Sequence, residues 1–244
     1  MLQERILMIP KKIHYIWLGE EPKSTLTKVC INSWRRVLED YQIIEWNETS
    51  LDLRSLCKEH RFLRECVRLK LWAFASDWLR LYVLYHEGGV YLDTDIEVLK
   101  PYDELLSNRM FVGLEQNDYI GTGVIGAEKG NSTVKRLLDF YECEIWTVDF
   151  VNNPIIFRYL YEREPESFAG CRILPQNVLS PYVPGRQYER TVETKDTLSI
   201  HWYSKNWNLS RKGYVFVNTK HINNPARKIF EIIRKSLGYE LRNR

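Results

Sequence analysis

Two aspartates follow a short apolar run near the middle of this 244-residue chain. The run at 90–92 leads directly into Asp93-Thr94-Asp95. Residues two apart on a strand point the same way, so the sequence predicts both carboxylates on one side of the strand's carboxyl end. Such a pair suits a hard divalent cation, although a DxD after a strand is also common as an ordinary solvated turn.

A second pair of charged residues lies shortly before these aspartates. Asp77 and Arg80 are three positions apart in a segment whose apolar residues recur at helical spacing. They are expected one turn apart on this helix, where they pair with each other on the surface or bind a ligand. The predicted helix packs one face, carrying Leu69, Trp72, Ala73, Ser76, Leu79 and Val83, and stops at Gly88-Gly89.

The rest of the chain alternates strand and helix patterns. Apolar, β-rich runs predict strands at 13–18, 42–46, 110–114, 124–127 and 198–203. Periodic segments predict helices after Pro22 with Val29 on the packed face, at 55–59, from Asn131 or Ser132 onward, and from Asn224-Pro225 to Gly238. Residues 165–184 carry four prolines and predict a loop-rich excursion.

This alternation predicts an α/β fold, with a mostly parallel sheet that helices cover on both faces. Such sheets bind ligands beyond the carboxyl ends of their strands, where Asp93 and Asp95 are expected. The composition, 44% hydrophobic and 13% aromatic, fits one globular core, and the net charge of +3 does not favour a nucleic-acid partner. Five cysteines without a CxxC pair are expected to be reduced and buried.

Three ordered motifs give the chain a family resemblance. They are IPKKIHYIWLG at 9–19, FASDWLR at 74–80 and GGVYLDTD at 88–95. They resemble the DXD-containing glycosyltransferases of family 32, which include capsular-polysaccharide and Och1-like mannosyltransferases, and the catalytic core of the large clostridial glucosylating toxins. The resemblance covers residues 9–103 closely and then rests on GTGVIGAEKG at 121–130 and HWYSKNW at 201–207.

The resemblance implies a single GT-A domain over residues 1–244, with a Rossmann-like, mostly parallel sheet. The donor and metal core is expected at 9–130, and acceptor-side and closing elements at 131–244. The implied reaction moves a hexose from a nucleotide-sugar donor to a glycan or lipid-linked saccharide, with retention, in capsular or exopolysaccharide synthesis. The implied cofactor is Mn²⁺ or Mg²⁺.

The resemblance also assigns roles to residues. Asp95 is expected to bind the metal directly, and Asp93 to reach it through water or to contact the donor ribose. Asp77 and Arg80 are expected to hold donor-sugar hydroxyls, and Tyr91 to line the donor pocket.

Further expectations concern residues elsewhere in the chain. Trp17, with Ile16 and Leu18 beside it, either stacks on the nucleobase or packs in the core. His201 is either a further metal ligand or a packing residue. Ser204, Asn206 and Trp207 are expected to close over the diphosphate. Asn153-Pro154 stands where many relatives read Thr-Gly-Pro, so the acceptor side departs from the family pattern.

Three alternatives remain beside the glycan-directed transferase. A haloacid-dehalogenase-type phosphatase also has a DxD after a strand, but it needs Thr or Val where this chain has Glu97. A carbohydrate-binding module would explain the many aromatic residues but not Asp77, Arg80 and the DxD in this order. A toxin-like transferase acting on a protein side chain is disfavoured by the small single-domain chain.

Membrane contact is the last expectation. The sequence has no signal-peptide core and no long apolar run, which predicts a cytoplasmic protein, at most peripheral at the inner face of the plasma membrane. The helix at 224–238 carries Ile229, Phe230, Ile233 and Leu237 with Arg227, Lys228, Arg234 and Lys235 around them. This pattern fits either weak attachment to anionic lipid or core packing with a solvated basic face.

Overall fold

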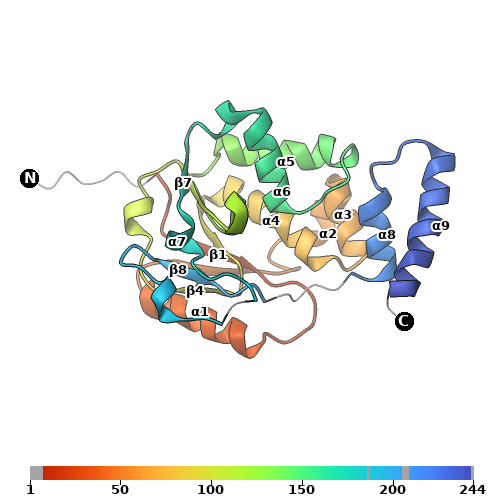
Figure 1. The fold of residues 1–244 in the computed structure, drawn as a ribbon. Coiled ribbons are helices and arrows are strands. Elements are labelled where there is room, and N and C mark those ends of the chain that lie inside the picture. The colour runs from red at the N-terminus through yellow and green to blue at the C-terminus, as the bar shows by residue number, and fades with distance from the viewer. Residues whose placement is uncertain (1–7, 186, 205–208, 243–244) are drawn as a thin grey trace, which may run out of the picture.

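A six-stranded sheet with the order β2-β1-β3-β6-β5-β7 forms the centre of the molecule (Figure 1). The computed structural model describes residues 8–185, 187–204 and 209–242. The strands of the sheet are β1 (Lys12–Ile16), β2 (Gln42–Trp46), β3 (Gly89–Leu92), β5 (Met110–Leu114), β6 (Ile120–Ala127) and β7 (Cys171–Leu174). A separate antiparallel pair joins β4 (Ile96–Val98) to β8 (Ser199–His201).

The sheet is mostly parallel, as the alternating pattern predicts. β1 runs parallel to β2 and β3, and β5 runs parallel to β7, while β6 is antiparallel to both β3 and β5. Because β6 reverses direction between them, β3 and β5 point the same way, and their carboxyl ends lie at the same edge of the sheet.

Helices cover both faces of the sheet. The helices are α1 (Thr25–Val37), α2 (Leu53–Glu59), α3 (Arg61–Arg68), α4 (Trp72–Glu87), α5 (Ser132–Cys143), α6 (Asn153–Arg163), α7 (Gln176–Leu179), α8 (Arg211–Thr219) and α9 (Pro225–Arg242). Figure 1 shows α1 on one side of the sheet and α4, α5 and α6 on the other. One hydrophobic core packs α2 to α6 on the sheet, and a second packs α1 and α7 on its opposite face.

Several sequence expectations need correction. Leu69 lies in the turn before α4 rather than on its packed face, and Val29 is 49% exposed on α1. α9 does not stop at Gly238 but continues to Arg242, because Tyr239 still packs on the α8 side. Cys143 is exposed, although Cys30 and Cys66 are buried thiols as expected.

The core helix α4 is buried on nearly all sides, not along one stripe. Its buried positions include two charged residues, Asp77 and Arg80, beside large apolar ones such as Trp78 and Leu81. α4 packs between the sheet and the helices α3 and α5, so most of its circumference has a neighbour. A charged pair inside such a helix must be satisfied by specific partners.

Candidate active site

β3 directs the first group of site residues toward α4. Along β3, Val90 and Leu92 pack in the core on the α1 side, while Tyr91 packs in the core on the α4 side. Asp93 is two positions after Tyr91 and follows the same alternation, so its carboxylate also reaches the α4 side. The Asp93 amide donates to the Gly123 carbonyl of β6 at 2.8 Å, which fixes the backbone where the strand ends.

Arg80 of α4 joins these residues into one network. Its guanidinium is 3.0 Å from an Asp77 oxygen and 3.0 Å from an Asp93 oxygen. It also donates to the Thr122 carbonyl at 2.6 Å, and it lies over the Tyr91 ring, 4.5 Å from the centroid. The Tyr91 hydroxyl donates to Asp93 at 2.8 Å. The structure therefore brings together Asp77, Arg80, Tyr91 and Asp93.

This network is buried, which changes the pKa values of its members. Burial raises the pKa of Asp77 to about 6, although Arg80 beside it opposes the shift. Burial alone would lower the pKa of Arg80, but Asp93, Tyr91 and Asp77 around it raise the pKa above its ordinary value. Arg80 is therefore a permanent positive charge that holds Asp93 in place.

Asn153 supports Asp77 from α6. Its backbone amide donates to the Asp77 carboxylate at 3.2 Å, and its side-chain amide donates to the Asp77 carbonyl at 2.9 Å. The Asn153 side-chain oxygen in turn accepts from the Tyr141 hydroxyl at 2.7 Å. The position where the sequence departs from the family pattern thus has a definite role in fixing Asp77, and Asn153 is itself fully buried.

Asp95 forms a second group with residues at and just after the end of β8. The Ser204 amide and hydroxyl donate to one Asp95 oxygen at 2.7 and 3.0 Å. His201 Nε2 is 3.5 Å from the other oxygen. Tyr203 has a φ of 50° and stacks its ring on His201 with centroids 3.8 Å apart. This left-handed turn lets the chain place both His201 and Ser204 against Asp95.

Glu115 completes this second group, although the sequence analysis did not select it. Its carboxylate contacts His201 Nδ1 at 3.1 Å, so His201 lies between Glu115 and Asp95. Glu115 directly follows β5, whose carboxyl end lies at the same edge as that of β3. The position of Glu115 directly after the predicted strand 110–114 could therefore have identified it as a candidate site residue.

Asp93, Asp95 and His201 can hold a metal ion together. Each offers one ligand atom, and these atoms lie within 4.8 Å of one another. Burial alone would lower the pKa of His201, but the neighbouring carboxylates of Asp95 and Glu115 raise it to about 10. Burial alone would raise the pKa of Asp95, yet His201 and Ser204 outweigh burial and lower it. Without a cation, a protonated His201 thus balances the acidic side chains.

Two glycines of β6 make room for this cluster. A Cβ at Gly123 would lie 3.2 Å from the His201 ring and 3.3 Å from an Asp93 oxygen. A Cβ at Gly121 would lie 2.6 Å from the Glu115 side chain. The Gly121-Thr122-Gly123 motif therefore has a physical explanation, because a larger side chain at either position would crowd the site.

The three predicted nucleotide-side residues at the end of β1 differ in exposure. Ile16 is buried and packs in the core, and Leu18 is half-buried against the same core. Trp17 is also only half-buried, with its ring nitrogen donating to the Glu21 carbonyl at 3.1 Å and the Lys23 ammonium 5.2 Å from its ring. Trp17 is thus not a core residue. Asn206 and Trp207 lie outside the described residues.

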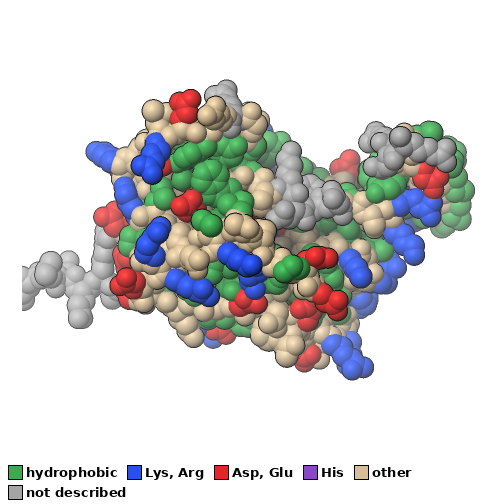
Figure 2. Space-filling view, turned by 90° about the horizontal axis from the view of Figure 1, so that it is seen from below, with side chains coloured by type: hydrophobic (Ala, Val, Ile, Leu, Met, Phe, Trp, Pro, Cys, Tyr) green, Lys and Arg blue, Asp and Glu red, His purple; other side chains and the backbone are tan. Residues whose placement is uncertain are grey.

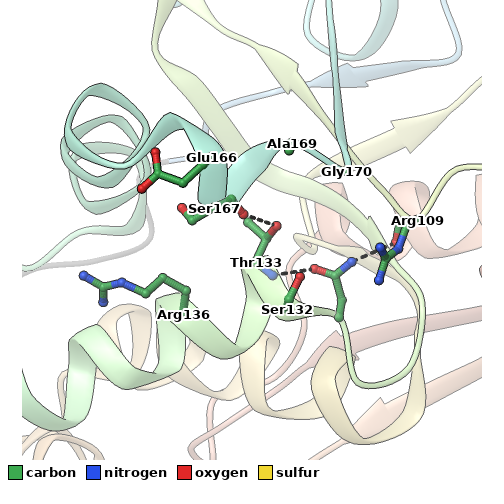
Figure 3. A pocket seen from close by; sticks show the side chains of 9 residues that line it. Arg109, Ser132, Thr133, Arg136, Glu166, Ser167, Ala169 and Gly170 are labelled. Atoms are coloured by element: carbon green, nitrogen blue, oxygen red, sulfur yellow. Dashed lines mark hydrogen bonds between the residues drawn. The ribbon is translucent and has the colours of Figure 1, made fainter.

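Two pockets lie at different edges of the sheet. One of about 190 Å³ is lined by Glu115, Tyr119 and Tyr203 among others, beside the Asp95 group. Another of about 350 Å³ is lined by Arg109, Arg136 and the start of α5 (Figure 3). Arg109 precedes β5, so the larger pocket lies at the edge opposite Glu115. Arg109 pairs with Glu128 and Arg136 with Glu164, so their charges are already balanced.

Comparisons with known proteins agree with this geometry. Residues 24–112 match the family model described as a glycosyltransferase sugar-binding region containing a DXD motif. Inositol phosphoceramide mannosyltransferase 3 of Schizosaccharomyces pombe is 25% identical over 226 residues, which cover 87% of this chain and 60% of the relative. Subversion of eukaryotic traffic protein A of Legionella pneumophila is 28% identical over 162 residues, covering 55% of this chain and 25% of that protein.

A solved structure supports the fold. The UDP-bound glycosyltransferase domain from the YGT toxin is similar with a TM-score of 0.53 and 12% identity, covering 94% of this chain and 89% of that domain. The chain spans less than two thirds of the length of the curated relatives named above. The predicted GT-A fold is confirmed, and the predicted resemblance is confirmed over residues 24–112, which match the DXD-containing sugar-binding region of glycosyltransferases.

Proposed function

We propose that the protein transfers a hexose from a nucleotide-sugar donor, with the help of a divalent metal, to a glycan or a lipid-linked saccharide. The observation that carries the proposal is the cluster of Asp93, Asp95 and His201 at the carboxyl edge of the sheet. Two carboxylates suit Mg²⁺ or Mn²⁺, and the imidazole nitrogen favours Mn²⁺ of the two. The buried Arg80 beside the cluster holds Asp93 in a fixed orientation.

The residues around the cluster have distinct tasks in this proposal. A divalent cation held by Asp93, Asp95 and His201 supplies positive charge where the leaving diphosphate becomes more negative. Ser204 orients Asp95 through two hydrogen bonds, and Glu115 orients His201 through Nδ1. Asp77 and Arg80 take the donor-sugar hydroxyls.

The relatives help to choose candidate substrates. One relative is a mannosyltransferase, and one similar solved domain binds UDP, so GDP-mannose and UDP-hexoses come first in a donor panel. Trp17, half-exposed at the end of β1, is proposed to stack on the base. Retention at the anomeric carbon and a place in capsular or exopolysaccharide synthesis are proposed from the resemblance to family 32.

The pocket beside Glu115 is proposed to receive the acceptor sugar. It offers about 190 Å³ next to the metal cluster, with the aromatic rings of Tyr119 and Tyr203 and the carboxylate of Glu115 on its walls. Apolar ring faces together with a few polar groups are typical of small-molecule sites.

The experiment is slow hydrolysis of the donor in the absence of acceptor. Water then takes the place of the acceptor, and the nucleotide diphosphate released from each donor is measured with Mn²⁺ and with EDTA. Wild type should hydrolyse one donor only when the cation is present, and Asp95→Asn should lose this turnover by a factor on the order of 100 or more. Asp139→Asn, an exposed aspartate on α5, should behave as wild type. Near-wild-type turnover in Asp95→Asn with the cognate donor would refute the proposed site.

A further inference from the structure

The C-terminal helix α9 presents a stripe of large apolar side chains to solvent. Ile229, Phe230, Ile233, Leu237 and Leu241 are between 55% and 76% exposed. With Ile232 they make up six of the ten large hydrophobic side chains that are exposed in the described part of the chain. Their spacing places them on one face of the helix. The alternative that this stripe packs in the core is therefore wrong.

The opposite face of α9 is held by α8, so the apolar stripe has a fixed direction. The Tyr239 hydroxyl donates to the Leu209 carbonyl at 2.8 Å, and the Lys235 ammonium donates to Asn218 at 3.3 Å. The rings of Tyr214 and Tyr239 pack with centroids 5.6 Å apart. α9 is thus docked on α8 while its apolar face points outward.

Positive charge surrounds this face. Residues 211–242 contain eight Lys or Arg and two Asp or Glu, and without Lys220, which is buried against the body, they carry a net charge of +5, whereas the whole chain carries only +3. Figure 2 shows hydrophobic side chains along the outer edge of the projecting part at the right of the view, with Lys and Arg side chains beside them. An amphipathic helix with basic flanks is the pattern of helices that lie in a membrane interface.

We propose that the face formed by Ile229, Phe230, Ile233, Leu237 and Leu241 docks on an anionic lipid surface. No helix of the described residues is long and apolar enough to cross a membrane, so α9 would lie in the interface. The charge of the hairpin α8–α9 is the observation that selects an anionic lipid surface over a second copy of the chain, because two such hairpins would repel each other.

Docking would also keep the metal cluster within a limited distance of the membrane. Ser204 bonds Asp95, and α8 begins seven residues later at Arg211, a stretch that reaches at most about 25 Å. Resting on the proposed function, this placement favours a saccharide carried on a lipid over a free glycan as the acceptor.

The test is flotation of the purified protein with vesicles. Wild type should float with vesicles that contain phosphatidylglycerol and stay behind with vesicles of phosphatidylcholine alone, and salt should weaken the binding. The double variant Ile233→Glu/Leu237→Glu should bind the anionic vesicles about tenfold or more weakly, because two apolar contacts become charged. Val29→Glu, at a half-exposed position on α1, is the matched control and should bind as wild type.

Two further measurements make the outcome decisive. Equal recovery with both kinds of vesicle, or no flotation at all, would overturn the proposal. So would a dimer, detected by light scattering, that Ile233→Glu/Leu237→Glu dissociates, because the face would then be an interface between two copies. Donor hydrolysis without vesicles should be equal in all these variants, so loss of flotation and loss of the proposed activity can be told apart.

Discussion

Both oxygens of the Asp95 carboxylate have polar partners in the protein even before a cation binds. Two donors from Ser204 and the imidazole of His201 face its two oxygens, while Arg80 faces Asp93. Without these partners, two neighbouring carboxylates would repel each other, and Asp95→Asn would stabilise the metal-free fold. The structure assigns each carboxylate its own positive partner.

The metal-free stability of Asp95→Asn tests this difference. We expect the substitution to lower the free energy of unfolding by about 1–3 kcal/mol, because it removes the charge that His201 and Ser204 bind in a buried place. Urea denaturation in EDTA measures it, with Asp139→Asn as the control at an exposed carboxylate. A higher urea midpoint for Asp95→Asn would instead show that repulsion dominates at this site.

Glu115 sets the orientation of a proposed metal ligand. It holds His201 Nδ1, which leaves Nε2 directed at Asp95. Removing such a supporting carboxylate usually costs a factor of about 10 to 100 in metal affinity. We therefore expect Glu115→Gln to weaken Mn²⁺ binding by about tenfold, and His201→Ala to weaken it further, with excess Mn²⁺ restoring part of the turnover.

Titration calorimetry with Mn²⁺ measures both variants. Glu128→Gln is the matched control, because this carboxylate pairs with Arg109 at the opposite edge of the sheet. Unchanged Mn²⁺ affinity in both Glu115→Gln and His201→Ala would show that His201 is not a metal ligand.

At the scale of elements, the sequence predicts the pieces with strong local patterns. The strands 42–46 and 110–114 and the helix from Ser132 coincide with the structure, because their periodicity and caps are local features. Four helices, α3, α6, α7 and α8, were not predicted, and α7 lies within residues 165–184, which were expected to be loop-rich. α6 begins at Asn153-Pro154, and its start is held by contacts with Asp77, which lies 76 positions earlier. Such long-range contacts have no local signature.

A buried lysine helps to hold the end of α8 on the body of the protein. Lys220, directly after α8, donates to the carbonyls of Ile145 and Val148. Burial lowers the pKa of Lys220 to about 8 from its ordinary 10.5, although Asp149 opposes the shift. Between these two values the unfolded chain binds a proton that the folded chain does not, so the free energy of unfolding should rise with pH.

Lys220→Met tests this linkage. As the pH rises from about 7 to about 10, wild type should gain stability relative to Lys220→Met, because only wild type has the buried ammonium to deprotonate. Urea denaturation across this range measures the difference between the two proteins. Lys135→Met removes an exposed lysine of α5 and should keep the wild-type pH dependence. A constant difference between wild type and Lys220→Met would contradict the lowered pKa.

At the scale of the whole molecule, the site joins distant parts of the chain. The sequence could select Asp77, Arg80, Asp93 and Asp95, because they lie in two of the motifs that carry the family resemblance. It left His201 undecided and missed Glu115, since the contact that pairs them spans 86 positions and depends on how β4–β8 packs beside the sheet. Gly121 and Gly123 of β6 leave room for the Glu115 and His201 side chains, so the reason for this glycine motif can be seen only once the packing is known.

A bound cation should therefore stabilise the whole fold. Asp93 and Asp95 follow β3, while His201 ends β8, so a cation held by all three would tie the central sheet to the β4–β8 pair. A ligand that binds only the folded chain adds about 2.7 kcal/mol of stability at 100 times its Kd. We expect Mn²⁺ to raise the Tm of wild type and EDTA to reverse the increase. Asp95→Asn should show little or no increase, whereas Glu128→Gln should respond as wild type. If Mn²⁺ raised the Tm of Asp95→Asn as much as that of wild type, the cation would bind elsewhere, and the assignment of Asp93, Asp95 and His201 as its ligands would be wrong.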